Sequence, residues 1–114
     1  MPQVKNTTTT AYAASLVVSS TPKTRLCGLS GYNSKTSSQF IQIHDAASLA
    51  SIPDTSVPKV VFEVAASSKF AIDFGANPRT FDTGIVVCNS STAPTKTIGS
   101  ADCWFDVQTM PAIY

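Results

Sequence analysis

Residues 84–88 read Gly-Ile-Val-Val-Cys and residues 103–107 read Cys-Trp-Phe-Asp-Val, and these two stretches decide the fold class. The segment between them, residues 90–100, is rich in serine and threonine. Short apolar runs bounded by Gly, Pro, Asn and Ser are typical of strands joined by turns. The pattern therefore predicts strands at residues 80–89 and 102–108, separated by a long loop and paired with each other.

The predicted pairing also decides where the cysteines lie. Its best apolar face collects Phe81, Ile85, Val87, Cys103, Phe105 and Val107. Side chains alternate between the two faces of a strand, so Cys88 lies on the opposite face from Cys103, and a disulfide between them is disfavoured. The chain has three cysteines without metal-ligand spacing. We expect Cys27, Cys88 and Cys103 to be buried or half-buried free thiols.

The composition indicates one domain and excludes several classes of partner. A chain of 114 residues is long enough to bury a core of its own. The net charge is +1 and there is no run of Lys or Arg, so the basic surface that nucleic acid requires is missing. No apolar run approaches the ~20 residues of a membrane span, and the N-terminus is too polar for a secretory signal. We expect neither nucleic acid nor membrane as a partner.

The first half of the chain repeats the strand-and-turn pattern. Strands are predicted at residues 12–18, 24–29 and 39–44, with a loop at 31–38. In the third of these strands Ile41 and Ile43 point to one side, and Gln42 and His44 point to the other, toward solvent or a partner. Residues 46–52 predict a helical turn with Asp45 as its N-cap, which crosses between two sheets.

Residues 59–74 contain the clearest local pattern, two alternating runs that predict a hairpin. Placing Phe62 opposite Phe70 also sets Glu63 against Lys69, and Lys59 against Asp73. Each such aromatic or opposite-charge pair contributes roughly 0.2–1 kcal/mol. A turn follows at residues 75–79.

Together these segments predict an all-β protein, a compact antiparallel β-sandwich of jelly-roll-like form. We divide the chain into a polar N-terminal arm at residues 1–10, a sandwich domain at 11–109 and an apolar C-terminal tail at 110–114. Two roles remain open for the ends of the chain. They pack against neighbouring subunits, or they pair at the edges of their own sheet.

The sequence offers no catalytic, metal or cofactor site. His44 is the only histidine, and its neighbour Asp45 is poorly placed to orient it because adjacent strand residues face opposite ways. We read His44 as a surface histidine. The seven carboxylates are scattered, and no glycine-rich phosphate loop is present. We therefore predict no enzyme activity and no cofactor.

Trp104 is the strongest candidate for binding. It shares a strand face with Asp102 and Asp106, and an exposed tryptophan on a polar face suits the anchor of an interface. The alternative is that the N-terminal arm or a loop covers this face, so that Trp104 packs internally. The candidate interface residues are Trp104, Asp102, Asp106, Thr8, Thr9, Ile113 and Tyr114.

Several segments resemble small virion proteins of tailed bacteriophages. They are Phe-Asp-Thr-Gly-Ile-Val-Val at 81–87, Asn-Ser-Ser-Thr at 89–92, Thr-Lys-Thr-Ile-Gly at 95–99, Asp-Cys-Trp-Phe-Asp-Val-Gln at 102–108 and Ser-Gln-Phe-Ile-Gln-Ile-His-Asp at 38–45. The similarity is one of overall pattern, and the threonine-rich N-terminus departs from it.

The resemblance implies a β-sandwich that decorates or cements the outer face of a capsid, or that occupies the neck or tail. Its partners would be the major capsid protein or other virion proteins, and homo-oligomers, trimers among them, would suit an icosahedral lattice. Such a protein is made in the host cytoplasm and resides in the virion. A second class of function is a sugar- or receptor-binding module in which Trp104 forms a stacking platform.

Overall fold

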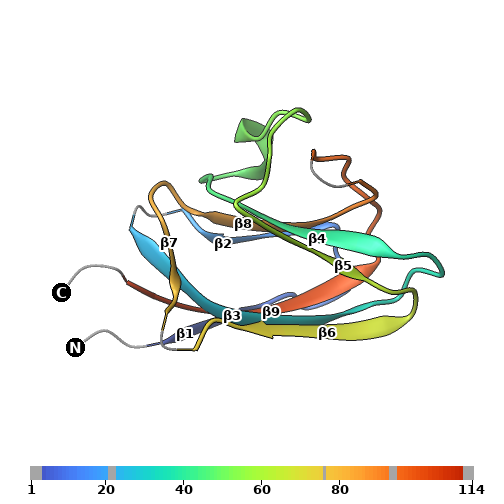
Figure 1. Cartoon of the computed structure of the whole chain (residues 1–114), viewed down its shortest axis with the longest axis horizontal. Coiled ribbons are helices and arrows are strands. Elements are labelled where there is room, and N and C mark those ends of the chain that lie inside the picture. The colour runs from blue at the N-terminus through green and yellow to red at the C-terminus, as the bar shows by residue number, and fades with distance from the viewer. Residues whose placement is uncertain (1–3, 21–22, 76, 93–94, 112–114) are drawn as a thin grey trace.

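The computed structural model describes residues 4–20, 23–75, 77–92 and 95–111. Two layers of antiparallel strands face each other across the molecule (Figure 1). The strands are β1 (Lys5–Thr8), β2 (Ser15–Ser19), β3 (Thr24–Asn33), β4 (Gln39–His44), β5 (Val60–Val64), β6 (Ser68–Asp73), β7 (Arg79–Phe81), β8 (Ile85–Ser90) and β9 (Cys103–Pro111). A single 3₁₀ turn, η1 (Leu49–Ser51), lies between β4 and β5.

The strand order is that of a jelly roll. Sheet A has the order β1-β9-β3-β6, with the short β7 beside β3, and sheet B has the order β2-β8-β4-β5. Apart from β7, the strands pair in nested fashion: β1 with β9, β2 with β8, β3 with β6, and β4 with β5. A double sheet of eight strands wound in this way is a jelly roll. The predicted fold class is confirmed.

The core fills the space between the two sheets. Its fully buried side chains come from both layers and include Leu26, Leu29, Ile41, Ile43, Phe81, Ile85, Val87, Phe105 and Val107. Phe62 of sheet B and Phe70 of sheet A meet across the core with ring centroids 5.7 Å apart, and Phe70 and Phe105, both of sheet A, have centroids 6.3 Å apart. Tilted pairs at this separation stabilise beyond the area that they bury.

The predicted hairpin at residues 59–74 is wrong, because its two strands belong to different sheets. β5 pairs with β4 in sheet B, and β6 pairs with β3 in sheet A. Phe62 and Phe70 do touch, but they do so across the core. Glu63 lies opposite Phe40, and Lys69 lies opposite Tyr32. The connection passes from one layer to the other through Ser67, whose φ is +50°.

The predicted strand at residues 80–89 is divided in the same way. β7 joins sheet A, and β8 joins sheet B between β2 and β4, so β8 faces β9 across the core instead of pairing with it. The side chains of the predicted apolar face do pack together, but they do so across the core between the two sheets. Cys103 points into this core, whereas Cys88 is buried outside it, and Cys27, Cys88 and Cys103 are free thiols.

Asp45 holds the crossover between β7 and β8 instead of capping a helix. Its carboxylate accepts hydrogen bonds from the backbone N–H groups of Asp82, Thr83 and Gly84, at 3.1, 2.8 and 3.3 Å. Partial burial raises the pKa of Asp45, but these three hydrogen bonds and the charge of Lys59 outweigh it and leave the pKa below its ordinary value. The predicted N-cap is wrong, since the cap position of η1 is Ser48.

Two further boundaries differ from the prediction. β3 continues to Asn33, because residues 31–33 pair with both β6 and β9 and are therefore not part of a loop. β2 begins only at Ser15, so Tyr12 lies outside it and is half exposed.

The outer face of sheet B is covered by the chain's own loops. The segment between β4 and β5 and the connection from β8 to β9 lie above this sheet (Figure 1). Gln42 Nε2 donates to the carbonyl oxygens of Thr92 and Thr95, both at 2.9 Å, and Lys96 Nζ donates to Ile52 O at 2.7 Å. Gln42 and His44 are consequently buried. The prediction that they face solvent or a partner is wrong, as is that of a surface histidine.

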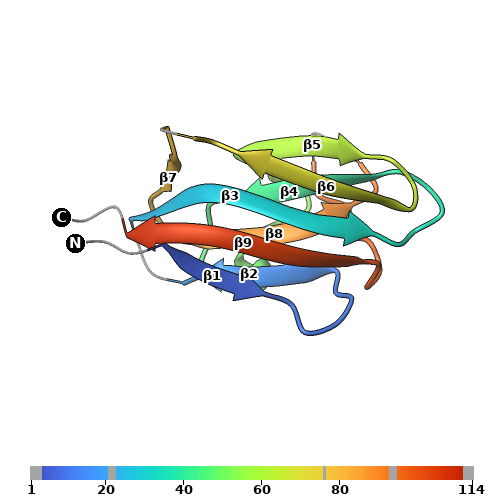
Figure 2. The ribbon, with the colours of Figure 1, turned by 90° about the horizontal axis from the view of Figure 1, so that it is seen from below.

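The outer face of sheet A has no such cover among the described residues. Seen from below, β6, β3, β9 and β1 lie side by side with no segment in front of them (Figure 2). The two outer faces of the sandwich therefore differ: one is closed by loops and the other is open.

Both ends of the described chain belong to sheet A. Lys5–Thr8 pair with Thr109 to Asp106 of β9, so for these residues the pairing alternative holds. β9 extends to Pro111 and takes in the first two residues of the predicted tail. Ile113 and Tyr114 lie outside the described residues.

Gly31 tests the packing between sheet A and the core. A Cβ at this position would meet the carbonyl oxygen of Trp104 and would lie 2.5 Å from Phe70 Cζ. We expect Gly31→Ala to lower the free energy of unfolding by about 1–3 kcal/mol, as overpacking does. Urea titration measures the change, with Ser30→Ala on the same strand as the control. Equal unfolding midpoints for wild type and Gly31→Ala would show that the close approach is absent.

Candidate interface groove

Four of the predicted interface residues lie together at one surface groove. Thr8, Thr9, Trp104 and Asp106 line it, and Thr10, Ala11, Tyr12 and Phe105 complete the lining. Its volume is about 500 Å³. We call it the Trp104 groove. It lies where the chain leaves β1 and passes alongside β9, at the open face of sheet A.

The alternation along β9 positions the floor of the groove. Cys103, Phe105 and Val107 are fully buried in the core, so Trp104 and Asp106 must point outward. The predicted division of faces along this strand is confirmed. The Trp104 side chain is 39% exposed, and its neighbour across the sheet is Tyr32 on β3. Trp104 therefore does not pack internally beneath the arm or a loop.

The wall of the groove is the segment that follows β1. Thr9 N donates to Phe105 O at 3.0 Å, and Phe105 N donates to Thr9 Oγ1 at 3.1 Å. Ala13 and Cys103 exchange two backbone hydrogen bonds. These contacts hold both ends of the segment against β9. Between them Tyr12 is 50% exposed.

Thr10, Ala11, Tyr12 and Phe105 are groove residues that the sequence prediction missed, and Tyr12 is the exposed aromatic residue among them. The sequence pattern placed Tyr12 at the start of a strand at residues 12–18, but that strand starts three residues later. Thr9 is hydrogen-bonded to β9, and this keeps Tyr12 out of β2. The sequence alone does not reveal hydrogen bonds between residues so far apart in the chain.

Asp102 lies outside the groove and makes contacts that hold neighbouring loops together. Its carboxylate accepts a hydrogen bond from Ser100 Oγ at 2.6 Å and lies 3.7 Å from Lys35 Nζ. Its carbonyl oxygen accepts from Ser34 N and from Ser34 Oγ. These contacts fix the start of β9 against the end of β3.

Asp106 gives the groove its only charge. Among the lining residues it is the one ionisable carboxylate, and none of them is basic. Gln108 Nε2 donates to Asp106 Oδ1 at 3.2 Å and to Asn6 Oδ1 at 2.8 Å. The residues opposite Asp106 on the neighbouring strands, Thr8 and Ser30, are neutral.

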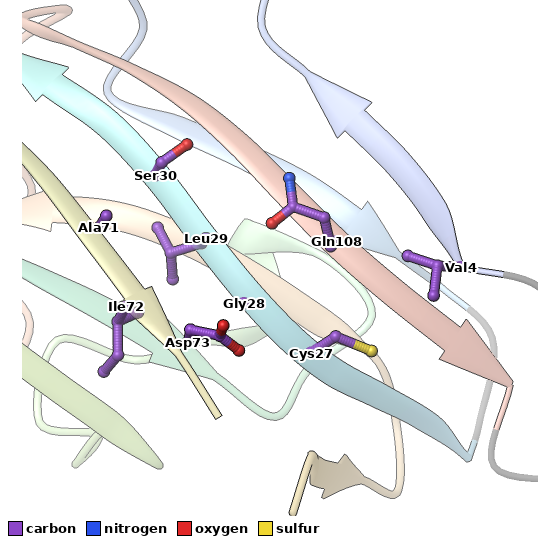
Figure 3. Close-up of a pocket in the computed structure, with 9 residues that line it drawn as sticks. All are labelled: Val4, Cys27, Gly28, Leu29, Ser30, Ala71, Ile72, Asp73 and Gln108. Atoms are coloured by element: carbon purple, nitrogen blue, oxygen red, sulfur yellow. The ribbon is translucent and has the colours of Figure 1, made fainter. Parts of the chain in front are cut away.

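A second hollow of about 490 Å³ lies on the open face of sheet A, over β3 (Figure 3). Gly28 leaves space there between Gln108 of β9 and Asp73 of β6, and Cys27 lines one end. Burial raises the pKa of the Cys27 thiol; the Arg25 charge lowers it and Asp73 raises it further. The thiol is thus protonated near neutral pH and is a poor nucleophile.

Cys88, Cys103 and His44 are buried and chemically quiet. Burial raises the pKa of Cys88 to about 11 and that of Cys103 to about 12. His44 Nε2 lies 2.9 Å from Gln42 Oε1, and burial together with the charge of Lys96 lowers the pKa of His44. Within the described residues, no three His, Cys, Asp or Glu side chains gather where they could hold a metal ion.

None of the helical segments in the described ranges is long and apolar enough to cross a membrane.

Comparison of the sequence with protein-family models and with curated proteins finds no match. Among solved structures, the fold is similar to the coat protein of Tobacco streak virus, with 12% sequence identity and a TM-score of 0.40. The match covers 99% of this chain and 89% of that chain. At this TM-score the two structures are only loosely alike.

The buried state of His44 leads to a prediction about pH. Its pKa in the folded protein lies below the ordinary 6.5, so the unfolded state binds more protons as pH falls below that value. Well above pH 6.5, the neutral His44 costs the folded protein nothing. As pH falls from 6.5 toward the lower folded pKa, the free energy of unfolding decreases by no more than about 1.4 kcal/mol per pH unit. The lowered pKa of Asp45 acts only below its ordinary 3.8.

We therefore expect the wild type to lose stability between pH 7.5 and pH 5, and His44→Gln to lose less over the same interval. Urea unfolding at the two pH values measures both differences. An equal loss in the two proteins would mean that His44 is free to protonate in the folded state.

Proposed function

We propose that this chain is a non-enzymatic structural protein of a virion, and that it decorates or cements a capsid by binding the assembled lattice of the major capsid protein. The observation that carries the proposal is a jelly roll with one outer face closed by its own loops and the other open, with an exposed tryptophan in a groove at its edge. Jelly rolls are frequent among viral capsid domains. The resemblance of the sequence to small phage virion proteins supports the same reading.

The two outer faces of the sandwich suggest different roles. On the closed face, polar side chains such as those of Gln42 and Lys96 donate hydrogen bonds to carbonyl groups of the chain's own loops. The open face keeps Trp104, Asp106 and Tyr32 available on neighbouring strands. Exposed aromatic residues that can be desolvated by a partner are typical anchors of protein interfaces. We propose that the open face, anchored at the Trp104 groove, contacts the virion partner.

Binding to the lattice would stabilise it by mass action. A ligand that binds only the assembled state contributes RT ln(1 + [L]/Kd), about 2.7 kcal/mol at a hundredfold excess over Kd. Many weak contacts on one particle would add avidity. Homo-oligomers, trimers among them, would increase that effect, and Ile113 and Tyr114 remain proposed contact residues. A position in the neck or tail would use the same open face.

A second candidate function is binding of a carbohydrate receptor. Tyr12 lies in the same groove as Trp104, and both rings are accessible beside the hydroxyl groups of Thr8, Thr9 and Thr10. Lectin domains also use the jelly roll. A sugar-binding module would bind its ligand as an isolated protein, without a particle.

Co-sedimentation with phage heads stripped of decoration proteins tests the proposed function. We expect saturable binding in fixed proportion to the lattice, and a loss of affinity of about thirtyfold in Trp104→Ala, as for an interface anchor worth about 2 kcal/mol. Val61→Ala is the matched control, because Val61 is 40% exposed on β5, at the edge of the sandwich remote from β1 (Figure 2). Its affinity should be that of the wild type.

Unrelated particles provide the negative control for the heads. Absence of binding to stripped heads would overturn the role of a decoration protein. Equal affinities of wild type and Trp104→Ala would remove the groove from the interface.

A further inference from the structure

We infer that the Trp104 groove takes a cationic side chain, arginine or lysine, presented by the protein partner. The inference rests on the proposed function, because it names the chemistry by which the partner would be recognised at that same groove. Three features of the groove lead to it: two accessible aromatic rings, one carboxylate, and the lack of a basic side chain among the lining residues.

The rings supply the first attraction. Trp104 is 39% exposed and Tyr12 is 50% exposed, and both line the groove. A cation within about 6 Å of an aromatic centroid is attracted by the negative face of the ring, and tryptophan is the best of the three aromatic residues for this purpose. Arginine also stacks its planar guanidinium on such rings.

The Asp106 carboxylate supplies the second attraction, and no cation from the described residues forms an ion pair with it. The ion pairs in the described part of the chain join Lys23 with Asp82, Lys35 with Asp102 and Lys96 with Asp54. Asp106 instead receives one neutral hydrogen bond from Gln108, on Oδ1. Its cross-strand neighbours Thr8 and Ser30 bring no charge. A half-buried carboxylate beside two aromatic rings is complementary to a positive ligand.

The charge favours a cation over a sugar as occupant. A neutral saccharide would desolvate Asp106 and offer it only hydroxyl hydrogen bonds, and an acidic one would repel it, whereas a guanidinium or ammonium group would also neutralise its charge. The groove volume of about 500 Å³ leaves room for a long side chain with its apolar stem against the rings.

Trp104 is the only tryptophan, so its fluorescence reports on the groove directly. We expect N-acetyl-arginine amide to change the emission saturably and N-acetyl-citrulline amide, its neutral isostere, to leave it unchanged. Asp106→Asn should weaken the arginine response about tenfold. Asp73→Asn, on the same face of sheet A but outside the groove, should respond as the wild type does. Galactose, glucose and N-acetylglucosamine serve as the sugar probes.

A response to arginine amide that citrulline amide reproduces, or no response up to about 0.1 M, would overturn the inference. A saturable response to one of the sugars without a response to arginine would overturn it in favour of a glycan site.

Variants on stripped heads separate this inference from the proposed function, with Glu63→Gln as the control because Glu63 is exposed on β5 of sheet B, away from the open face. If Asp106→Asn loses about tenfold in affinity while Glu63→Gln binds normally, and if added salt weakens the wild type more than Asp106→Asn, the cationic contact is supported. If Trp104→Ala loses binding and Asp106→Asn does not, the docking role stands and the cationic contact is wrong. If none of the proteins binds heads, the proposed function fails, and the arginine titration alone decides the chemistry of the groove.

Discussion

The pairing of β3 with β9 is the interaction on which the rest of the structure depends. It joins nine residue pairs, from Thr24 opposite Pro111 to Asn33 opposite Cys103. Because the sequence separation is large, this pairing must close most of the chain into one loop, and the nested pairs of the jelly roll follow from it. It also fixes the alternation by which Phe105 enters the core and Trp104 and Asp106 face outward. Gly31 on β3 makes that approach possible, since Phe70 and the Trp104 carbonyl group occupy the space of a side chain.

The two outer faces show how the same fold can treat polar strand residues in opposite ways. On sheet B, buried amides and an ammonium group are satisfied by loop carbonyl groups, and Lys96 also lies 3.4 Å from Asp54. Buried polar groups are costly unless they are paired, so these loops must stay closed for the sheet to remain stable. On sheet A, the corresponding groups face water. The strands of sheet A are therefore open on their outer face, whereas those of sheet B are reached only by displacing the loops that cover them.

The sequence predicted the fold class and the faces of the last strand, because both depend on local alternation. It could not predict which strands are neighbours. The alternation of Phe62 and Phe70 is the same whether the strands pair in one sheet or meet across a core, and only the latter occurs. The burial of Gln42 and His44 depends on carbonyl groups some fifty residues away, as at Thr92 and Thr95. The groove was found in part: Trp104, Asp106, Thr8 and Thr9 were expected, while Tyr12 required knowledge of where the segment after β1 leaves β9.

Amide hydrogen exchange of the protein, free and bound to stripped heads, tests the central claim that the open face and its groove form the interface. The account predicts protection on binding in residues 8–12 and 103–108, with exchange unchanged in the loops at residues 45–58 and 95–100 that close sheet B. Protection confined to those loops, with no change along β9 and the segment after β1, would contradict it.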